Sequence, residues 1–232
     1  MTHPPGCLAR RRALLGAGLA WALGAAGLPA RAGSFEDFFI ALAGDDVSKL
    51  LSLALRGFDI NTRSEKGVPP LMVAIAEDAL KSADFLLRQR TLDIDARNGN
   101  DENALMLAAL RGHVSLVQKL LQRGAEVNKP GWTPLHYAAS HAGKASAELI
   151  DLMLEHHAYI DAESPNGTTP LMMAARYGDV RGLKLLLEAG ADATLRNSIG
   201  LSAIDFATQA QRPENAALIA ASLRASSPKG SW

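Results

Sequence analysis

Past residue 32, apolar residues recur at the i, i+3 and i+4 spacing of amphipathic helices, in short runs separated by glycine and polar residues. Helices are predicted to start at Thr133-Pro134 and Thr169-Pro170, because threonine caps free N–H groups and proline presets the first turn. We expect Gly112 to end a first helix after about two turns and Gly190 to end a second helix. The pattern therefore predicts pairs of short helices joined by polar loops.

The same unit recurs along the chain. Residues 111–128 are mirrored by residues 177–194 at an offset of 66, twice 33. The polar residues that close successive units follow one another in steps of 34, 33, 33 and 33: Asn61, Asp95, Asn128, Asp161 and Thr194. A second marker, Thr133-Pro134-Leu135-His136-Tyr137-Ala138-Ala139, returns as Thr169-Pro170-Leu171-Met172-Met173-Ala174-Ala175. A fixed period of this length is typical of solenoid proteins.

These motifs and their period resemble those of ankyrin-repeat proteins, over about residues 35–224. The resemblance implies an all-α solenoid of about six helix-turn-helix units, including N- and C-terminal caps, joined by short hairpin loops. We interpret Ser34-Phe35-Glu36-Asp37 as a capping box that starts the first unit. The resemblance also implies that His136 hydrogen-bonds the hairpin backbone, a role lost where methionine replaces it in other units.

The first 32 residues differ in character from the rest. The basic run Arg10–Arg12 precedes an uncharged stretch, Ala13–Leu28, and Ala30-Arg31-Ala32 offers a small-x-small cleavage pattern. We predict a cleavable signal peptide over 1–32, a repeat domain over 33–224 and a disordered tail over 225–232. The predicted location is the periplasm of a bacterium. Retention as an uncleaved anchor stays open, although sixteen residues are short for a membrane span.

The export route has two alternatives. Arg11-Arg12-Ala13-Leu14-Leu15 resembles a twin-arginine signal, and glycines dilute the apolar stretch that follows it. Arg10 stands where serine or threonine is usual in such signals, so the general secretion route stays open.

Charge and cysteine content exclude several classes of protein. The chain has 24 basic and 24 acidic residues and a single cysteine, Cys7. Removal of the signal takes four arginines and Cys7, leaving 20 basic against 24 acidic residues, because 24 minus 4 is 20. A mildly acidic chain with scattered basic residues is a poor partner for nucleic acid. It also has no thiol for a disulfide or a thiolate metal site.

Catalytic motifs are not found in the sequence. The chain has no nucleophile elbow, phosphate loop or His-Glu-x-x-His pattern. His136 and His141 are five residues apart and His156 and His157 are adjacent, so neither pair shares one helix face as metal ligands would. We therefore expect no metal, no cofactor and no enzymatic activity.

The resemblance implies that a partner protein binds the concave face, formed by hairpin tips and first helices. The partner would be a periplasmic enzyme, a toxin or an envelope protein, and this chain an accessory, protective or immunity factor. We expect a monomer, with a self-assembling envelope scaffold as the alternative. Trp132 lies in a shortened hairpin, and it acts either as a binding hot spot or as a cover for neighbouring hairpins. The candidate partner-binding residues are Lys66, Arg97, Asn100, Glu102, Arg111, Trp132, His141, Arg176 and Tyr177.

Overall fold

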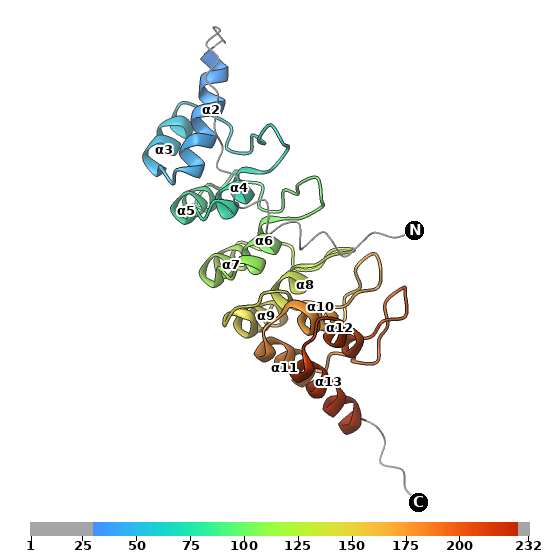
Figure 1. The fold of residues 1–232 in the computed structure, drawn as a ribbon. Coiled ribbons are helices and arrows are strands. Elements are labelled where there is room, and N and C mark those ends of the chain that lie inside the picture. The colour runs from blue at the N-terminus through green and yellow to red at the C-terminus, as the bar shows by residue number, and fades with distance from the viewer. Residues whose placement is uncertain (1–29, 227–232) are drawn as a thin grey trace, which may run out of the picture. The chain divides into compact units, whose positions relative to one another are not determined.

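The structure is a computed structural model that describes residues 30–226. In this range, helices follow one another in pairs, and each pair forms one unit (Figure 1). The first, or inner, helices of units 1 to 6 are α2 (Ala30–Ala43), α4 (Pro70–Ala76), α6 (Ala104–Arg111), α8 (Pro134–Ala139), α10 (Pro170–Tyr177) and α12 (Ala203–Gln209). The second, or outer, helices are α3 (Val47–Leu55), α5 (Leu80–Leu87), α7 (Val114–Gln122), α9 (Ser146–Glu155), α11 (Val180–Glu188) and α13 (Pro213–Ser226).

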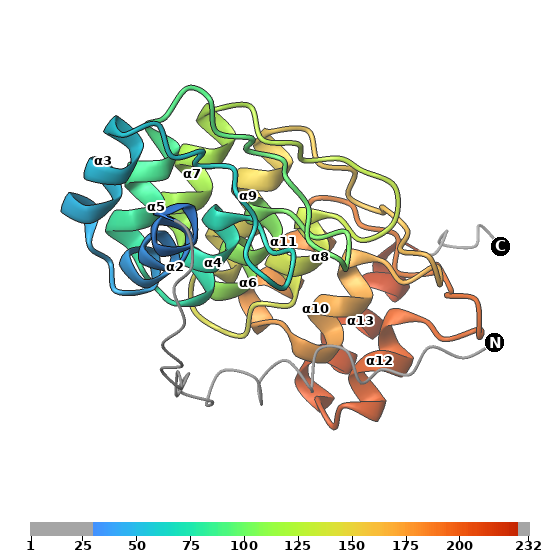
Figure 2. The ribbon, with the colours of Figure 1, turned by 90° about the horizontal axis from the view of Figure 1, so that it is seen from above.

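Five loops lead from one unit into the inner helix of the next, and we call them fingers. Finger 2 spans residues 62–69, finger 3 spans 96–103, finger 4 spans 129–133, finger 5 spans 162–169 and finger 6 spans 195–202. Both views show these loops extending away from the helices on one side of the repeat domain (Figures 1 and 2). The fingers and the inner helices together form what we call the inner face, which corresponds to the predicted concave face.

The core lies between the two layers of helices. Each unit buries its apolar stripe against its neighbours, since a short helix pair cannot form a core alone. Leu105, Leu135 and Leu171 of successive inner helices are fully buried, as are Leu120 and Ile150 of the outer helices. The paired alanines of the inner helices are fully buried too, so neighbouring inner helices pack closely: Ala108, Ala109, Ala138, Ala139, Ala174 and Ala175.

Aromatic side chains close the core at unit 1. Phe38 is buried and stacks on Phe58 with ring centroids 4.6 Å apart. The predicted helix start at Ser34 is wrong, because α2 begins at Ala30 and Ser34 lies inside it. Alanine and arginine are strong helix formers, so the helix continues N-terminally past the serine.

Most of the predicted signal peptide and most of the predicted tail lie outside the described residues. The basic run, the apolar stretch and Cys7 lie outside the described residues. At the other end, Ala225 and Ser226 belong to α13, and the rest of the predicted tail lies outside the described range. No helix within residues 30–226 is long and apolar enough to cross a membrane.

A ladder of hydrogen bonds joins consecutive units. Asn61 Oδ1 accepts from the backbone N–H of Asp93 at 2.8 Å, and the same bond recurs one repeat later in each following pair of units. The equivalent donor and acceptor pairs are Glu126 to Asp95, Tyr159 to Asn128 and Asp192 to Asp161, at 2.8, 2.9 and 3.0 Å. The unit-closing polar residues of the sequence are therefore the links that fix one unit on the next.

Asparagine and aspartate are not equivalent in this ladder. Asn61 and Asn128 also donate through Nδ2, to the carbonyl oxygens of Thr91 and His157. Partial burial raises the pKa of Asp95 and of Asp161, although the hydrogen bond that each accepts from the backbone opposes this shift. The asparagine links therefore make two bonds without a buried charge.

Two glycines end helices for different reasons. Gly190 follows α11 with φ 95°, the left-handed region that disfavours a side chain, as predicted. Gly178 ends α10 in an extended conformation, with φ −72°. A Cβ at Gly178 would lie 2.3 Å from the carbonyl oxygen of Ala139. Gly178 is thus required for the close approach of two inner helices.

Candidate protein-binding surface

Four of the five fingers share one turn. In finger 2 the N–H of Ser64 donates to the carbonyl of Val68, four residues on, at 3.0 Å. The same bond closes finger 3 from Asn98 to Glu102, finger 5 from Ser164 to Thr168 and finger 6 from Asn197 to Leu201. This bond holds each of the four fingers as a narrow hairpin.

Finger 4 is shorter than the others. Five steps separate Asn128 from Thr133, whereas eight separate Asp161 from Thr169. The link between the helices of unit 4 is correspondingly longer, since α8 ends at Ala139 and α9 begins at Ser146. The deletion and the insertion cancel, so the unit keeps its step of 33 residues.

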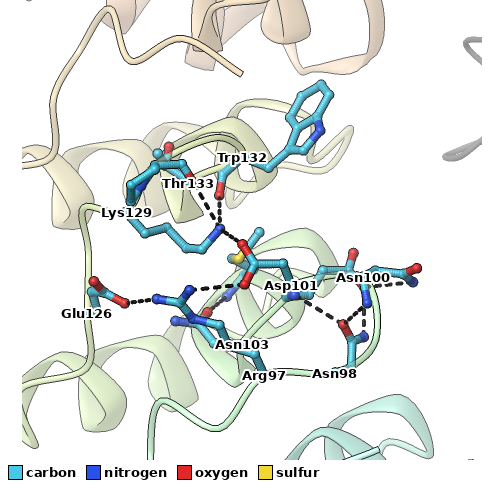
Figure 3. Close-up of polar contacts among 12 residues, drawn as sticks. Arg97, Asn98, Asn100, Asp101, Asn103, Glu126, Lys129, Trp132 and Thr133 are labelled. Carbon is cyan, nitrogen blue, oxygen red and sulfur yellow. Dashed lines mark hydrogen bonds and ion pairs between the residues drawn. The ribbon is translucent and has the colours of Figure 1, made fainter. Parts of the chain in front are cut away.

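A buried lysine takes the place of the missing turn. The side chain of Lys129 is only 1% exposed, and its ammonium donates to the carbonyl oxygens of Pro130 and Trp132, both at 3.1 Å. It also forms an ion pair with Asp101 Oδ2 of finger 3 at 2.5 Å (Figure 3). Buried lysine is rare unless it is paired. Lys129 therefore closes finger 4 and fastens it to finger 3.

Asp101 makes this contact from a strained backbone conformation. Its φ is 60°, and the equivalent positions of fingers 2, 5 and 6 are the glycines Gly67, Gly167 and Gly200, all with positive φ. Arg97 Nη1 bonds the same carboxylate at 3.0 Å, and Arg97 Nη2 reaches Glu126 Oε2 at 2.6 Å. The hydrogen bond from Lys129, followed by that from Arg97, lowers the pKa of Asp101. The carboxylate is thus held in its charged form between two cations.

The remaining fingers are also joined to one another. Arg63 Nη1 of finger 2 donates to the carbonyl of Arg97 in finger 3 at 2.6 Å. Finger 5 is tied to finger 6, because Ser198 N–H donates to the Asn166 carbonyl at 2.9 Å. The whole row of fingers is consequently cross-linked by polar contacts, which limits the entropy that a partner would remove on binding.

His136 joins finger 4 to finger 5, as the sequence predicted. Its Nε2 lies 2.9 Å from the carbonyl oxygen of Thr168, and its Nδ1 lies 3.2 Å from the N–H of Thr133. A carbonyl only accepts, so Nε2 carries the proton and Nδ1 accepts from Thr133. Burial lowers the pKa of His136 to about 4, and the nearby charge of Lys129 adds a smaller effect in the same direction. The imidazole is therefore neutral at physiological pH.

Four of the candidate binding residues are engaged within the protein. Arg97 belongs to the finger network described above, and Glu102 is 9% exposed, with Oε1 accepting from the Tyr137 hydroxyl at 2.5 Å. Arg111 bonds Asp78 Oδ2 at 2.9 Å and the Ala76 carbonyl at 2.5 Å. The ring of His141 packs on Gly112, and its Nδ1 lies 3.0 Å from the Leu110 carbonyl. The polar atoms of these four side chains are therefore bonded within the protein, where they stabilise the surface.

The other five candidates leave atoms open to solvent. Lys66 and Asn100 are exposed at the tips of fingers 2 and 3, and Trp132, Arg176 and Tyr177 are half-buried. The indole of Trp132 meets His136 edge-on, with centroids 5.2 Å apart. It points away from the polar network around Lys129 (Figure 3). A fixed, half-open aromatic ring of this kind is typical of protein-binding hot spots.

Two features of this surface were not predicted from the sequence. Ile199 is 74% exposed at the tip of finger 6, where finger 3 has Asn100 and finger 5 has Asn166. The other feature is the ion pair between Lys129 and Asp101, two residues that the sequence places in hairpin tips. An alignment of the fingers by their turn could have singled out Asp101, because the equivalent position in fingers 2, 5 and 6 is glycine. The shortening of finger 4 could have singled out Lys129, which lies beside the deletion.

The described residues give no sign of a metal centre. Between Ala30 and Ser226, no group of three or more His, Cys, Asp or Glu residues is placed to hold a metal ion. The Asp101 carboxylate is paired with Arg97 and Lys129 and joins two fingers.

Stacked helix pairs with cross-linked fingers define a helical repeat protein of the solenoid class. The family model described as "Ankyrin repeats (3 copies)" matches residues 38–130, 71–164, 105–197 and 141–225, which together cover most of the chain. The chain belongs to the ankyrin repeat family. Ankyrin repeats generally mediate protein–protein interaction, and their domains are typically binding modules rather than enzymes.

Similar proteins are found in several kingdoms. The chain is 29% identical to the human transient receptor potential cation channel subfamily A member 1 over 65% of its own length, and 34% identical to the mouse nuclear factor NF-kappa-B p105 subunit over 61%. It spans only 14% and 15% of these two relatives.

Two solved structures share the fold. An ankyrin repeat domain from Acinetobacter baumannii has a TM-score of 0.66, at 23% identity, over 80% of this chain and 96% of that one. The human ASB11 ankyrin repeat domain has a TM-score of 0.68, also at 23% identity, over 80% and 82%. Both the predicted all-α fold and the predicted solenoid of helix pairs are confirmed.

The buried imidazole predicts a dependence of stability on pH. Between pH 6.5 and pH 4 the unfolded chain protonates His136 and the folded chain does not. Stability from the neutral imidazole is therefore present above pH 6.5 and is lost as the pH falls toward 4. We expect His136 to lower the free energy of unfolding by about 2 kcal/mol between pH 7 and pH 5, measured by urea unfolding.

The control is His136→Met, because methionine occupies this position in units 2, 3 and 5. This variant keeps all other titrating groups and should lose only the share of the pH dependence that comes from His136. Equal slopes of stability against pH in the two proteins would contradict the assignment.

Proposed function

We propose that this chain is an exported, periplasmic protein that binds a partner protein through its inner face and performs no catalysis itself. The observation that carries the proposal is the cross-linked row of fingers, which holds Trp132 and Ile199 toward solvent on a rigid base. Rigid aromatic and apolar anchors bind with little loss of conformational entropy. The role is that of an accessory, protective or immunity factor for a periplasmic enzyme, a toxin or an envelope protein.

Several features favour the inner face over the outer helices as the contact surface. The solvent-facing positions of the outer helices in units 3 to 5 are polar or charged: Gln118 and Gln122, Asp151 and Glu155, Lys184 and Glu188. Within the described outer helices, exposed leucines are confined to units 1 and 2: Leu51, Leu55 and Leu80. The inner face instead combines aromatic, arginine and aliphatic side chains, the composition that protein interfaces favour.

Export is supported by the N-terminal sequence. A basic run, an apolar stretch and a small-x-small pattern follow one another in the order that a signal peptide requires. The absence of cysteine after Cys7 suits an oxidising compartment, where a free thiol would be vulnerable.

The binding proposal predicts a selective effect of Trp132→Ala. We expect the variant to melt like the wild type, as followed by circular dichroism, because its ring is half-buried and lies outside the polar network. The partner is first captured from a periplasmic extract on the immobilised wild-type domain. Its affinity for Trp132→Ala should be at least about thirtyfold lower than for the wild type, the loss typical of a hot spot. Isothermal titration with the captured protein measures that loss.

Tyr159→Ala is the matched control, since the Tyr159 side chain is 69% exposed and the substitution keeps the backbone N–H that bonds Asn128. It should bind like the wild type. A lowered melting temperature of Trp132→Ala with unchanged binding would show that the ring only covers neighbouring hairpins.

The export proposal predicts where the protein is found in a bacterial cell. Fractionation followed by mass spectrometry should recover the chain from the periplasm, with its N-terminus at Gly33. Replacement of Arg11 and Arg12 by lysine should block export by a twin-arginine route and leave general secretion intact. Full-length protein in the cytoplasm of the unmodified strain would refute the location.

A further inference from the structure

Eight lysine and arginine residues of the described chain are buried or half-buried, and all but one of them contact an oxygen atom of the protein. Seven of them contact an oxygen atom of the protein: Lys49, Arg97, Arg111, Lys119, Arg123, Lys129 and Arg212. Arg176 is the eighth, and no hydrogen bond or ion pair joins its side chain to any residue between Ala30 and Ser226. A half-buried guanidinium has five donors and no acceptor, so this arginine leaves strong donors unused by the protein.

Two aromatic rings hold Arg176 in place. Its Cζ lies 5.4 Å from the ring centroid of Tyr177 and 6.0 Å from that of Phe206. Tyr177 ends α10 and Phe206 lies in α12, so the guanidinium sits at the junction of two neighbouring inner helices. A ring attracts the guanidinium through its charge and does not use up the N–H donors at the edges of the group. The two rings therefore lie beside the guanidinium and leave its donors available.

The carboxylates closest in sequence to Phe206 and Arg176 are bound to other groups. Asp205, next to Phe206 in the chain, accepts from the N–H and the hydroxyl of Ser202 at 2.8 and 2.7 Å and caps α12. Asp179 accepts from Arg181 Nε at 2.9 Å. Both hydrogen-bonding arrangements lower the pKa of the carboxyl group involved. The fork of Arg176 is thus left without an anionic partner in units 5 and 6 of the described chain.

We propose that Arg176 receives a carboxylate side chain, aspartate or glutamate, of the partner protein. A carboxylate matches the planar fork with two parallel hydrogen bonds, and the charge pair strengthens both. The inference rests on the proposed function and adds the chemistry of the bound segment. That segment carries an acidic residue that reaches the junction of α10 and α12.

A phage-displayed library of random peptides, selected on the immobilised protein, tests this chemistry without knowledge of the natural partner. We expect the enriched peptides to share an aspartate or glutamate. Their affinity should fall at least about tenfold on Arg176→Gln and less on Arg176→Lys, which keeps the charge and loses the fork. Arg181→Gln is the matched control, because Arg181 is exposed on α11 and paired with Asp179.

Changing the peptide's acid to its amide gives a readout that a purely structural role of Arg176 would not move. The amide peptide should bind the wild type about tenfold more weakly than the acid, and both peptides should bind Arg176→Gln alike. Equal losses on the two proteins would overturn the proposal, as would a selection that yields no peptide with a shared acid.

Trp132→Ala separates this inference from the proposed function. Peptides that depend on Trp132 and not on Arg176 would refute only the carboxylate contact. Peptides that depend on neither residue would refute the inner face as the binding surface as well.

Discussion

The step from one unit to the next is fixed by a side-chain oxygen that accepts a hydrogen bond from a backbone N–H of the following unit. Asn61, Asp95, Asn128 and Asp161 each make this bond at 2.8 to 3.0 Å. These N–H groups are exposed or partly buried, so each bond contributes about 0.5 to 1.5 kcal/mol, and the four bonds together favour one step between the units. The buried alanines of the inner helices and the turns of the fingers recur with the same period along the chain.

Unit 4 shows what that constraint permits. Its finger is shorter and its inter-helix link is longer, yet Asn128 and Asp161 remain 33 residues apart. Shortening removes the backbone turn that closes the other fingers, and the Lys129 ammonium replaces it with two bonds to finger carbonyls. A buried cation needs an anion, which explains why Asp101 stands in finger 3 where other fingers have glycine. The irregular unit thus brings a strained aspartate, a buried lysine and a half-open tryptophan into one place.

Sequence reasoning predicted the regular features of this molecule well, because they follow from local rules. Helix starts at Thr133 and Thr169, the left-handed Gly190 and the contact from His136 to the next finger all depend on residues close in sequence or one period apart. The first helix start was wrong because capping residues cannot stop a helix that good helix formers extend from the other side. The ladder residues were recognised by period, but their bonds required coordinates.

The candidate residues fall into two groups. Lys66, Asn100, Trp132, Arg176 and Tyr177 leave atoms open on the inner face, whereas Arg97, Glu102, Arg111 and His141 are bound within the protein. A repeat alignment shows which positions face a partner, but it does not show which side chains find acceptors in the next unit. That information depends on contacts between residues about 30 to 35 positions apart, as in the pairs Arg111 with Asp78 and Tyr137 with Glu102.

Lys129 replaces the missing turn of finger 4, and its ion pair with Asp101 fixes that finger on finger 3. A double-mutant cycle of Lys129→Met and Asp101→Asn, measured by urea unfolding, tests this coupling. Methionine keeps the apolar stem, and asparagine tolerates the positive φ of residue 101. The two substitutions together should lower the free energy of unfolding by less than the sum of their separate effects, with a coupling of about 1 to 3 kcal/mol. Costs that add to within about 0.5 kcal/mol would contradict it.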